Sequence, residues 1–127
     1  MATNIVNGNN SRSITWTNDT GAAIASGAVV VMGATGDATL GIAAGDFAIA
    51  EEGEVLVQVA ATVTKATTGV WKTGESLMWD ASAAAFDDNA ATPATGDVDD
   101  SAVAYTDGAN GEVTAVVWFT GNPGAIA

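Results

Sequence analysis

The chain has no cysteine and no histidine, and it has three basic residues against fifteen acidic ones. Without cysteine there are no disulfide bonds, no thiol catalysis and no thiolate metal sites. Without histidine the commonest general base and the commonest metal ligand are missing. We therefore expect a protein that is not an enzyme and that holds neither a cofactor nor a metal.

The basic residues are too few to bind a polyanion. They are Arg12, Lys65 and Lys72, and the formal net charge is −12. Nucleic-acid binding needs a cationic stripe that displaces counterions from phosphates, and three separated residues cannot form one. An anionic membrane surface repels the chain for the same reason. No stretch approaches the roughly 18 apolar residues of a transmembrane helix. We expect neither a nucleic-acid partner nor a membrane partner.

Residues that favour helices are also scarce, whereas alanine, glycine, threonine and valine are abundant. A chain of 127 residues is expected to form one domain. Short apolar or alternating stretches are separated by turn signals about every eight to twelve residues, which is typical of a small sandwich or barrel. The sequence predicts an all-β, single-domain, barrel-like or sandwich-like fold of about eight or nine strands.

The predicted strands differ in the strength of their pattern. The clearest covers 54–60, where Val55, Val57 and Val59 alternate with polar or larger residues. A turn at 81–83 is expected to bring Phe86 back beside the strand at 76–80. The other expected strands cover 13–17, 28–32, 38–42, 47–50, 98–106 and 112–119.

The two ends of the chain have little apolar content. Residues 1–13 are polar and rich in asparagine, so we predict a flexible N-terminal arm. The arm is either a frayed terminus or a segment that becomes ordered on a partner surface. The β domain is expected to cover 14–120, and the tail 121–127, which contains Pro123, is expected to be loose.

The arm and the first strand hold the predicted partner contacts. These contacts are Asn4, Ile5, Val6, Arg12, Ile14 and Trp16. The four tryptophans, Trp16, Trp71, Trp79 and Trp118, have two open interpretations. They pack in the core, or they contact another subunit or partner, since tryptophan is enriched at interface hot spots.

No motif in the sequence predicts catalysis. Lys72-Thr73 lacks the glycine pattern and the following helix of a phosphate loop. Asp97, Asp99 and Asp100 lack the spacing of a calcium loop and indicate a solvated acidic loop. Glu51, Glu52 and Glu54 are a weak candidate for a hydrolase, because neighbouring residues on one strand point to opposite faces.

Four motifs in order resemble a known family. They are Leu40-Gly41-Ile42-Ala43, Gly45-Asp46, Glu52-Gly53-Glu54-Val55 and the segment GESLMWD at 74–80. This series resembles the phage capsid cement, or head decoration, family, over roughly 21–119. Met78 stands where the family has tyrosine, and the segment 101–104 lacks the family's glycine. Some members are labelled RecA/RadA recombinases, a label that the missing phosphate loop and missing basic surface contradict here.

The resemblance implies a β-tulip-type fold and a structural role. It implies that the protein binds the major capsid protein, forms homotrimers at local threefold positions and stabilises the expanded head against the pressure of packaged DNA. It also implies synthesis in the bacterial cytoplasm and a final location on the outer capsid surface of the virion. The alternative is a virion appendage module that binds a receptor or a carbohydrate.

Overall fold

The part of the chain that the structure describes contains eleven strands and no helix. The structure is a computed structural model, and it describes residues 2, 4–7 and 12–127. The strands are β1 (Ile5–Asn7), β2 (Ser13–Thr17), β3 (Val29–Met32), β4 (Asp37–Ala43), β5 (Glu52–Leu56), β6 (Val59–Thr64), β7 (Ser76–Asp80), β8 (Ala85–Asp88), β9 (Val98–Ala104), β10 (Thr114–Phe119) and β11 (Gly124–Ile126). Within these residues no helix is long and apolar enough to cross a membrane. The prediction of an all-β single domain is confirmed.

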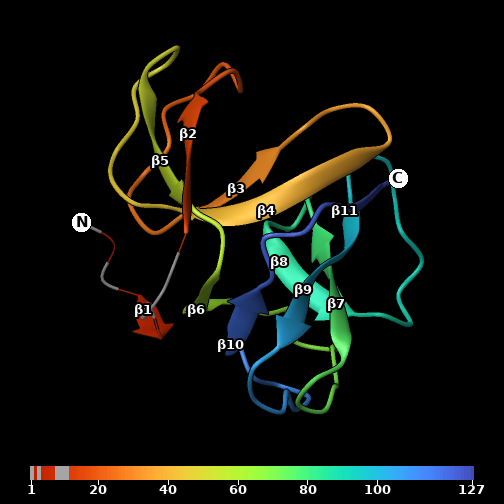
Figure 1. The fold of residues 1–127 in the computed structure, drawn as a ribbon. Coiled ribbons are helices and arrows are strands. Elements are labelled where there is room, and N and C mark those ends of the chain that lie inside the picture. Colours follow the sequence, from red (N-terminus) through yellow and green to blue (C-terminus); the bar gives the residue numbers. More distant parts are fainter. Residues whose placement is uncertain (1, 3, 8–11) are drawn as a thin grey trace.

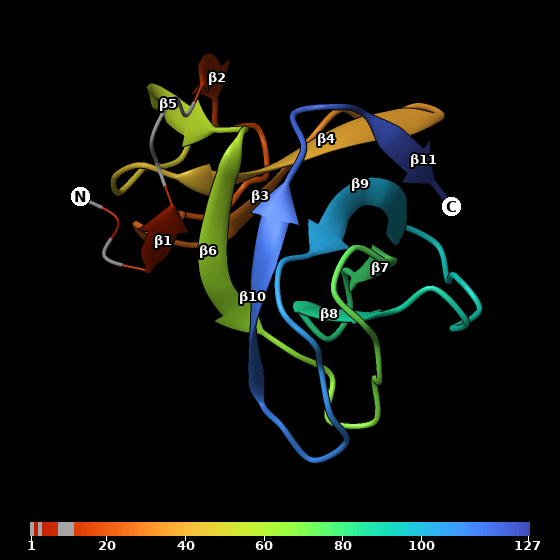
Figure 2. The same cartoon turned by 60° about the horizontal axis from the view of Figure 1, so that its bottom comes forward.

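One antiparallel sheet curls into a half-barrel (Figure 1). The strand order is β1-β6-β10-β9-β11-β4-β5-β2, with β3 added to β4 and the β7–β8 hairpin added to β9. Strands β6 and β10 run side by side through the body of the half-barrel (Figure 2). Strands β2 and β5 extend away from it beyond β4, and we call this pair the wing. The order places β1 and β2 at its two ends.

The apolar side chains form two clusters. The main core lies inside the half-barrel and includes Leu40, Phe86 and Phe119. The second cluster lies under the wing and includes Phe47 and Val55. Strand β3 contributes side chains to both clusters, because alternate side chains of a strand point to opposite faces. Val30 and Met32 join the second cluster, while Val29 and Val31 pack against the main core.

Several predicted local structures are confirmed. Strands at 13–17 and 76–80 match β2 and β7, and those predicted at 98–106 and 112–119 contain β9 and β10. The turn after β7 returns the chain as expected, since Trp79 lies opposite Phe86. Their ring centroids are 5.0 Å apart in an edge-to-face arrangement, which is a favoured geometry for aromatic pairs.

The prediction of one strand over 54–60 is wrong. Strand β5 ends at Leu56 and β6 begins at Val59, so the chain passes from the wing into the half-barrel between them. The apolar alternation continues through this break because Val55 enters the second cluster and Val59 enters the main core. The strand expected over 47–50 is reduced to a single bridge between Phe47 and Ile24.

The two ends of the chain are more structured than the sequence indicated. Gly124–Ile126, in the tail predicted to be loose, forms β11 between β4 and β9. A Cβ atom at Gly124 would collide with the backbone of Asp99, so this position requires glycine. In the predicted arm, Ile5–Asn7 forms β1 against β6. Residues 1, 3 and 8–11 of the arm lie outside the described residues.

Candidate interaction surface

The predicted contact residues lie on two separate elements. Asn4, Ile5 and Val6 belong to β1 or precede it, whereas Ile14 and Trp16 lie on β2. The structure therefore does not gather the six residues into one site. It places them on, or directly before, the two strands that end the strand order. An edge strand has one side without a strand partner, and that side is able to pair with another chain.

Asn4 fixes β1 to the domain. Its Nδ2 donates hydrogen bonds to the carbonyl oxygens of Gly27 (3.1 Å) and Thr62 (3.0 Å). Its own carbonyl accepts the N–H of Thr62 at 2.9 Å. Ile5 lies opposite Ala61 and packs against the main core. Asn4 and Ile5 therefore hold β1 against the rest of the domain.

Val6 is the exposed apolar side chain of β1. The register shifts between Ile5 and Asn7, which is the signature of a bulge. Val6 occupies this irregularity and is 53% exposed. A large apolar side chain exposed at a strand edge is a suitable contact for a partner.

Strand β2 presents a second apolar pair. Ile14 lies opposite Val55 and Trp16 lies opposite Gly53, so both side chains share the face of the second cluster. Ile14 is 42% exposed. Trp16 is half-buried, with its ring centroid 6.2 Å from that of Phe47. Trp16 thus packs against the second cluster and remains partly exposed.

Arg12 precedes β2, and its side chain is exposed. Its carbonyl oxygen accepts the N–H of Val57 at 2.7 Å, which continues the pairing of β2 with the chain after β5. This bond fixes the backbone at Arg12, while the residue itself is exposed to solvent.

The opposite face of the wing is acidic. The Thr15 hydroxyl donates a hydrogen bond of 2.6 Å to Glu54. This bond, with a second from Ser13, lowers the pKa of Glu54 below its ordinary value. Both bonds favour the carboxylate form. The wing therefore has an apolar face with Ile14 and Trp16 and a charged face with Glu54.

The prediction of a solvated acidic loop at Asp97, Asp99 and Asp100 is wrong, because Asp97 is buried and the other two residues lie in β9. The buried Asp97 accepts backbone N–H groups from Ala81 (3.0 Å) and Ala94 (2.9 Å), one on each oxygen. Burial raises the pKa of Asp99, and the nearby Asp100 and Asp97 raise it further. Among the described residues, no group of His, Cys, Asp or Glu side chains could hold a metal ion.

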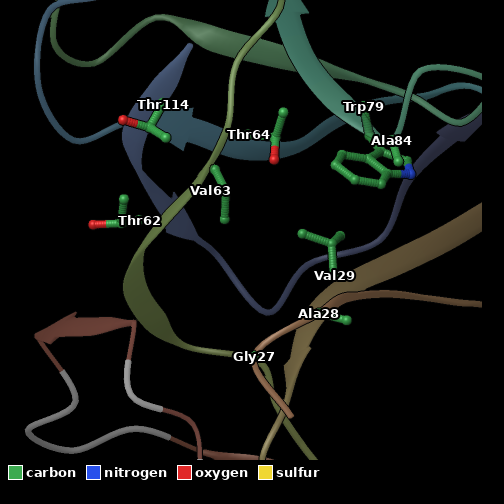
Figure 3. A pocket seen from close by; sticks show the side chains of 9 residues that line it. All are labelled: Gly27, Ala28, Val29, Thr62, Val63, Thr64, Trp79, Ala84 and Thr114. Carbon is green, nitrogen blue, oxygen red and sulfur yellow. The ribbon is translucent and has the colours of Figure 1, made fainter. Parts of the chain in front are cut away.

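A cavity of about 360 Å³ opens beside the start of β3 (Figure 3). Its walls are Gly27, Ala28, Val29, Thr62, Val63, Thr64, Trp79, Ala84 and Thr114. None of these side chains is acidic, basic or a strong nucleophile. The cavity therefore offers no group for acid-base chemistry.

The tryptophans divide between the two interpretations. Trp71 and Trp79 are buried in the main core. Trp16 and Trp118 are half-buried and reach the surface. Trp118 is not among the contact residues that the sequence predicts. The signal was present, because Trp118 alternates with the inward-facing Val117 and Phe119 on β10.

These features define an all-β domain with an exposed apolar side chain on each of its two edge strands, Val6 on β1 and Ile14 on β2. A family model described as phage cement protein matches residues 8–119. The chain belongs to the phage cement protein family, and its role is a structural one at the phage capsid. No curated protein matches the chain.

Proposed function

We propose that this protein binds the outer surface of the expanded phage head and stabilises it against the pressure of the packaged DNA. Its partner is the major capsid protein. The observation that carries the proposal is the position of β1 and β2 at the two ends of the strand order, each with an exposed apolar side chain, Val6 and Ile14. Edge strands of this kind recruit extended segments of a partner by strand addition.

The charge supports the outer surface as the location. A chain with a net charge of −12 is repelled by the DNA inside the head. On the outside the same charge keeps unbound copies soluble. We also propose that the protein acts as a homotrimer at local threefold positions and is synthesised in the host cytoplasm, as the family resemblance implies.

Co-sedimentation with expanded capsids tests the proposed contact. We expect the Ile14→Asp and Val6→Asp variants to bind at least tenfold more weakly. Each variant replaces an apolar side chain at the contact with a carboxylate, which must lose its bound water when the partner binds. Val70→Asp is the matched control, since Val70 is also exposed (56%) but lies in the loop between β6 and β7. Equal binding by all three variants and the unmodified chain would contradict the proposed contact.

Deletion of residues 1–13 is a second test and also removes β1. We expect this variant to lose capsid binding. Thermal melting separates loss of a contact from loss of the fold, because Ile5 packs against the main core. A folded deletion variant that still binds capsids would exclude the N-terminal segment as a contact.

A further inference from the structure

The outward-facing side chains of β6, β10 and β9 form one continuous surface. Trp118 lies opposite Ala60 on one side and Val103 on the other, and Val116 lies opposite Thr62. Directly opposite residues of a sheet project from the same face. The set, which we call the outer face, consists of Thr62, Thr64, Val103, Thr114, Val116 and Trp118, together with Asn7 of β1 and Tyr105, which follows β9. Ala60 projects from the same face but is fully buried. Its strands lie side by side in Figure 2.

The outer face is more apolar than a solvated face of a sheet should be. Antiparallel strands with one face in water alternate apolar residues inside with polar residues outside. Here the inward residues Ala61, Val117 and Ala104 are buried in the main core. The outward residues Val103, Val116 and Trp118 are apolar as well, and they are only half-buried. Tyr105 at the end of this row is 39% exposed.

The outer face also has no charged side chain, in a chain with fifteen acidic residues. The polar groups on it are hydroxyls and one amide. Asn7 donates from Nδ2 to the Tyr105 hydroxyl at 3.3 Å, and Thr62, Thr64 and Thr114 are exposed. Transfer of such neutral groups out of water costs much less free energy than transfer of carboxylates.

This charge pattern points to a particular partner. Two copies of a chain with a net charge of −12 repel each other, and like charges brought together in an interface cost several kcal/mol. The electrostatic repulsion between two copies is therefore smallest when they meet across a face that has no carboxylates. Aromatic side chains such as Trp118 and Tyr105 are the residues enriched at the centres of such contacts.

We propose that the outer face is the surface through which copies of this chain associate in solution. The inference rests on the proposed function for the need to self-associate, and it assigns that contact to a surface distinct from the edge of β2. It leaves Ile14 and Trp16 free to meet the capsid.

Analytical ultracentrifugation of the full chain tests this surface. We expect the Thr62→Glu and Thr114→Glu variants, alone and together, to weaken self-association by tenfold or more. Thr95→Glu is the matched control, because the same substitution is made at an exposed threonine in the loop before β9. All three positions are exposed, so circular dichroism and melting temperature should be unchanged. Should one outer-face variant fail to fold, the other single variant supplies the same test.

The outcomes separate this inference from the proposed function. Association lost in the outer-face variants and kept in Thr95→Glu supports it. An unmodified chain that sediments as a monomer at every concentration overturns it, as does full association of the Thr62→Glu and Thr114→Glu double variant. Capsid co-sedimentation is measured in parallel, so a monomer that still binds capsids refutes the outer face and leaves the proposed function standing.

Discussion

The Ser101 hydroxyl accepts a hydrogen bond from the backbone N–H of Leu40 at 3.0 Å, in a fully buried position. The same hydroxyl donates to the carbonyl oxygen of Asn122 at 2.9 Å. The side chain of Ser101 on β9 thus provides a hydrogen-bond partner for a backbone N–H of β4 and for a backbone carbonyl of the turn that leads into β11. These bonds connect β9 with β4 and with the turn before β11, which are distant from each other in sequence.

Replacement of Ser101 with alanine should destabilise the protein. The substitution leaves the buried N–H of Leu40 without a partner, which costs about 1–3 kcal/mol. Urea denaturation should show the loss as a lower midpoint with an unchanged slope. Ser82→Ala is the control, because Ser82 is exposed and bonds only within its own turn to Asp80. Equal stability of the two variants would show that the Leu40 bond contributes nothing.

Gly108 is expected to tolerate no side chain. Its N–H and carbonyl both pair with the backbone of Trp71, at 2.9 and 3.1 Å. A Cβ atom built on Gly108 would lie 2.5 Å from Cε2 of the indole, which is itself held by a bond from Nε1 to the Thr106 carbonyl at 3.2 Å. Overpacking of this kind costs about 1–3 kcal/mol.

The Gly108→Ala variant should therefore melt at a lower temperature than the unmodified chain. Gly45→Ala is its matched control, because no heavy atom outside the neighbouring residues lies within 4 Å of a Cβ atom at Gly45. We expect that change to be neutral or slightly stabilising. A Gly108→Ala variant as stable as Gly45→Ala would show that the indole moves aside freely.

The sequence predicted strands well where their signal is local. The alternation around Val55 and Val117 and the turn before Phe86 depend on neighbouring residues, so strand type and one hairpin were predictable. The break between Leu56 and Val59 was not predictable. Buried valines are needed on both sides of it, so the alternation of apolar residues continues through the break. Strands β1 and β11 have three residues each, and only their distant partners stabilise them.

The candidate surfaces were predictable to a smaller extent. The pattern at 13–17 located Ile14 and Trp16 on a strand, and the pairing shows that this strand lies at an edge. Composition could not reveal the outer face, because it depends on the register that places Val103 beside Trp118. The burial of Lys65 was not predictable either, because two of its neighbours, Phe86 and Val113, are distant from it in sequence.

Lys65 is buried, although no salt bridge involves it among the described residues. Its Nζ donates to the Ala66 carbonyl at 2.8 Å and lies 5.0 Å from the centroid of the Trp71 ring. Methionine has a similar length, and the Ala66 carbonyl keeps a second donor, the N–H of Gly69. We expect Lys65→Met to change the free energy of unfolding by about 1 kcal/mol or less, because removal of a buried charge offsets the lost contacts.

Lys65→Ala should cost more, about 2–5 kcal/mol, because it leaves a cavity beside the indole. Lys72→Met is the control for the change of charge, since the Lys72 side chain is 82% exposed. Chemical denaturation of the three variants checks the prediction. Should Lys65→Met lose as much stability as Lys65→Ala, the ammonium group itself would be the stabilising element.

Acid should destabilise the protein through carboxylates that accept hydrogen bonds. The backbone N–H and hydroxyl of Thr73 donate to Asp107 at 2.8 and 2.9 Å, and these bonds lower its pKa. Bonds from Ser82 and Ala83 lower the pKa of Asp80 in the same way. A group whose pKa is lower in the folded state stabilises the fold above its unfolded pKa of about 4. That contribution is lost as the pH falls through the folded pKa.

Asp99 has the opposite effect, because its pKa is raised in the fold. Its contribution to stability therefore increases as the pH falls from its folded pKa toward the unfolded value. Melting temperatures measured from pH 6 down to pH 2 should fall less steeply for Asp107→Asn than for the unmodified chain, and more steeply for Asp99→Asn. Parallel curves for both variants would mean that neither carboxyl titrates differently in the folded and unfolded chains.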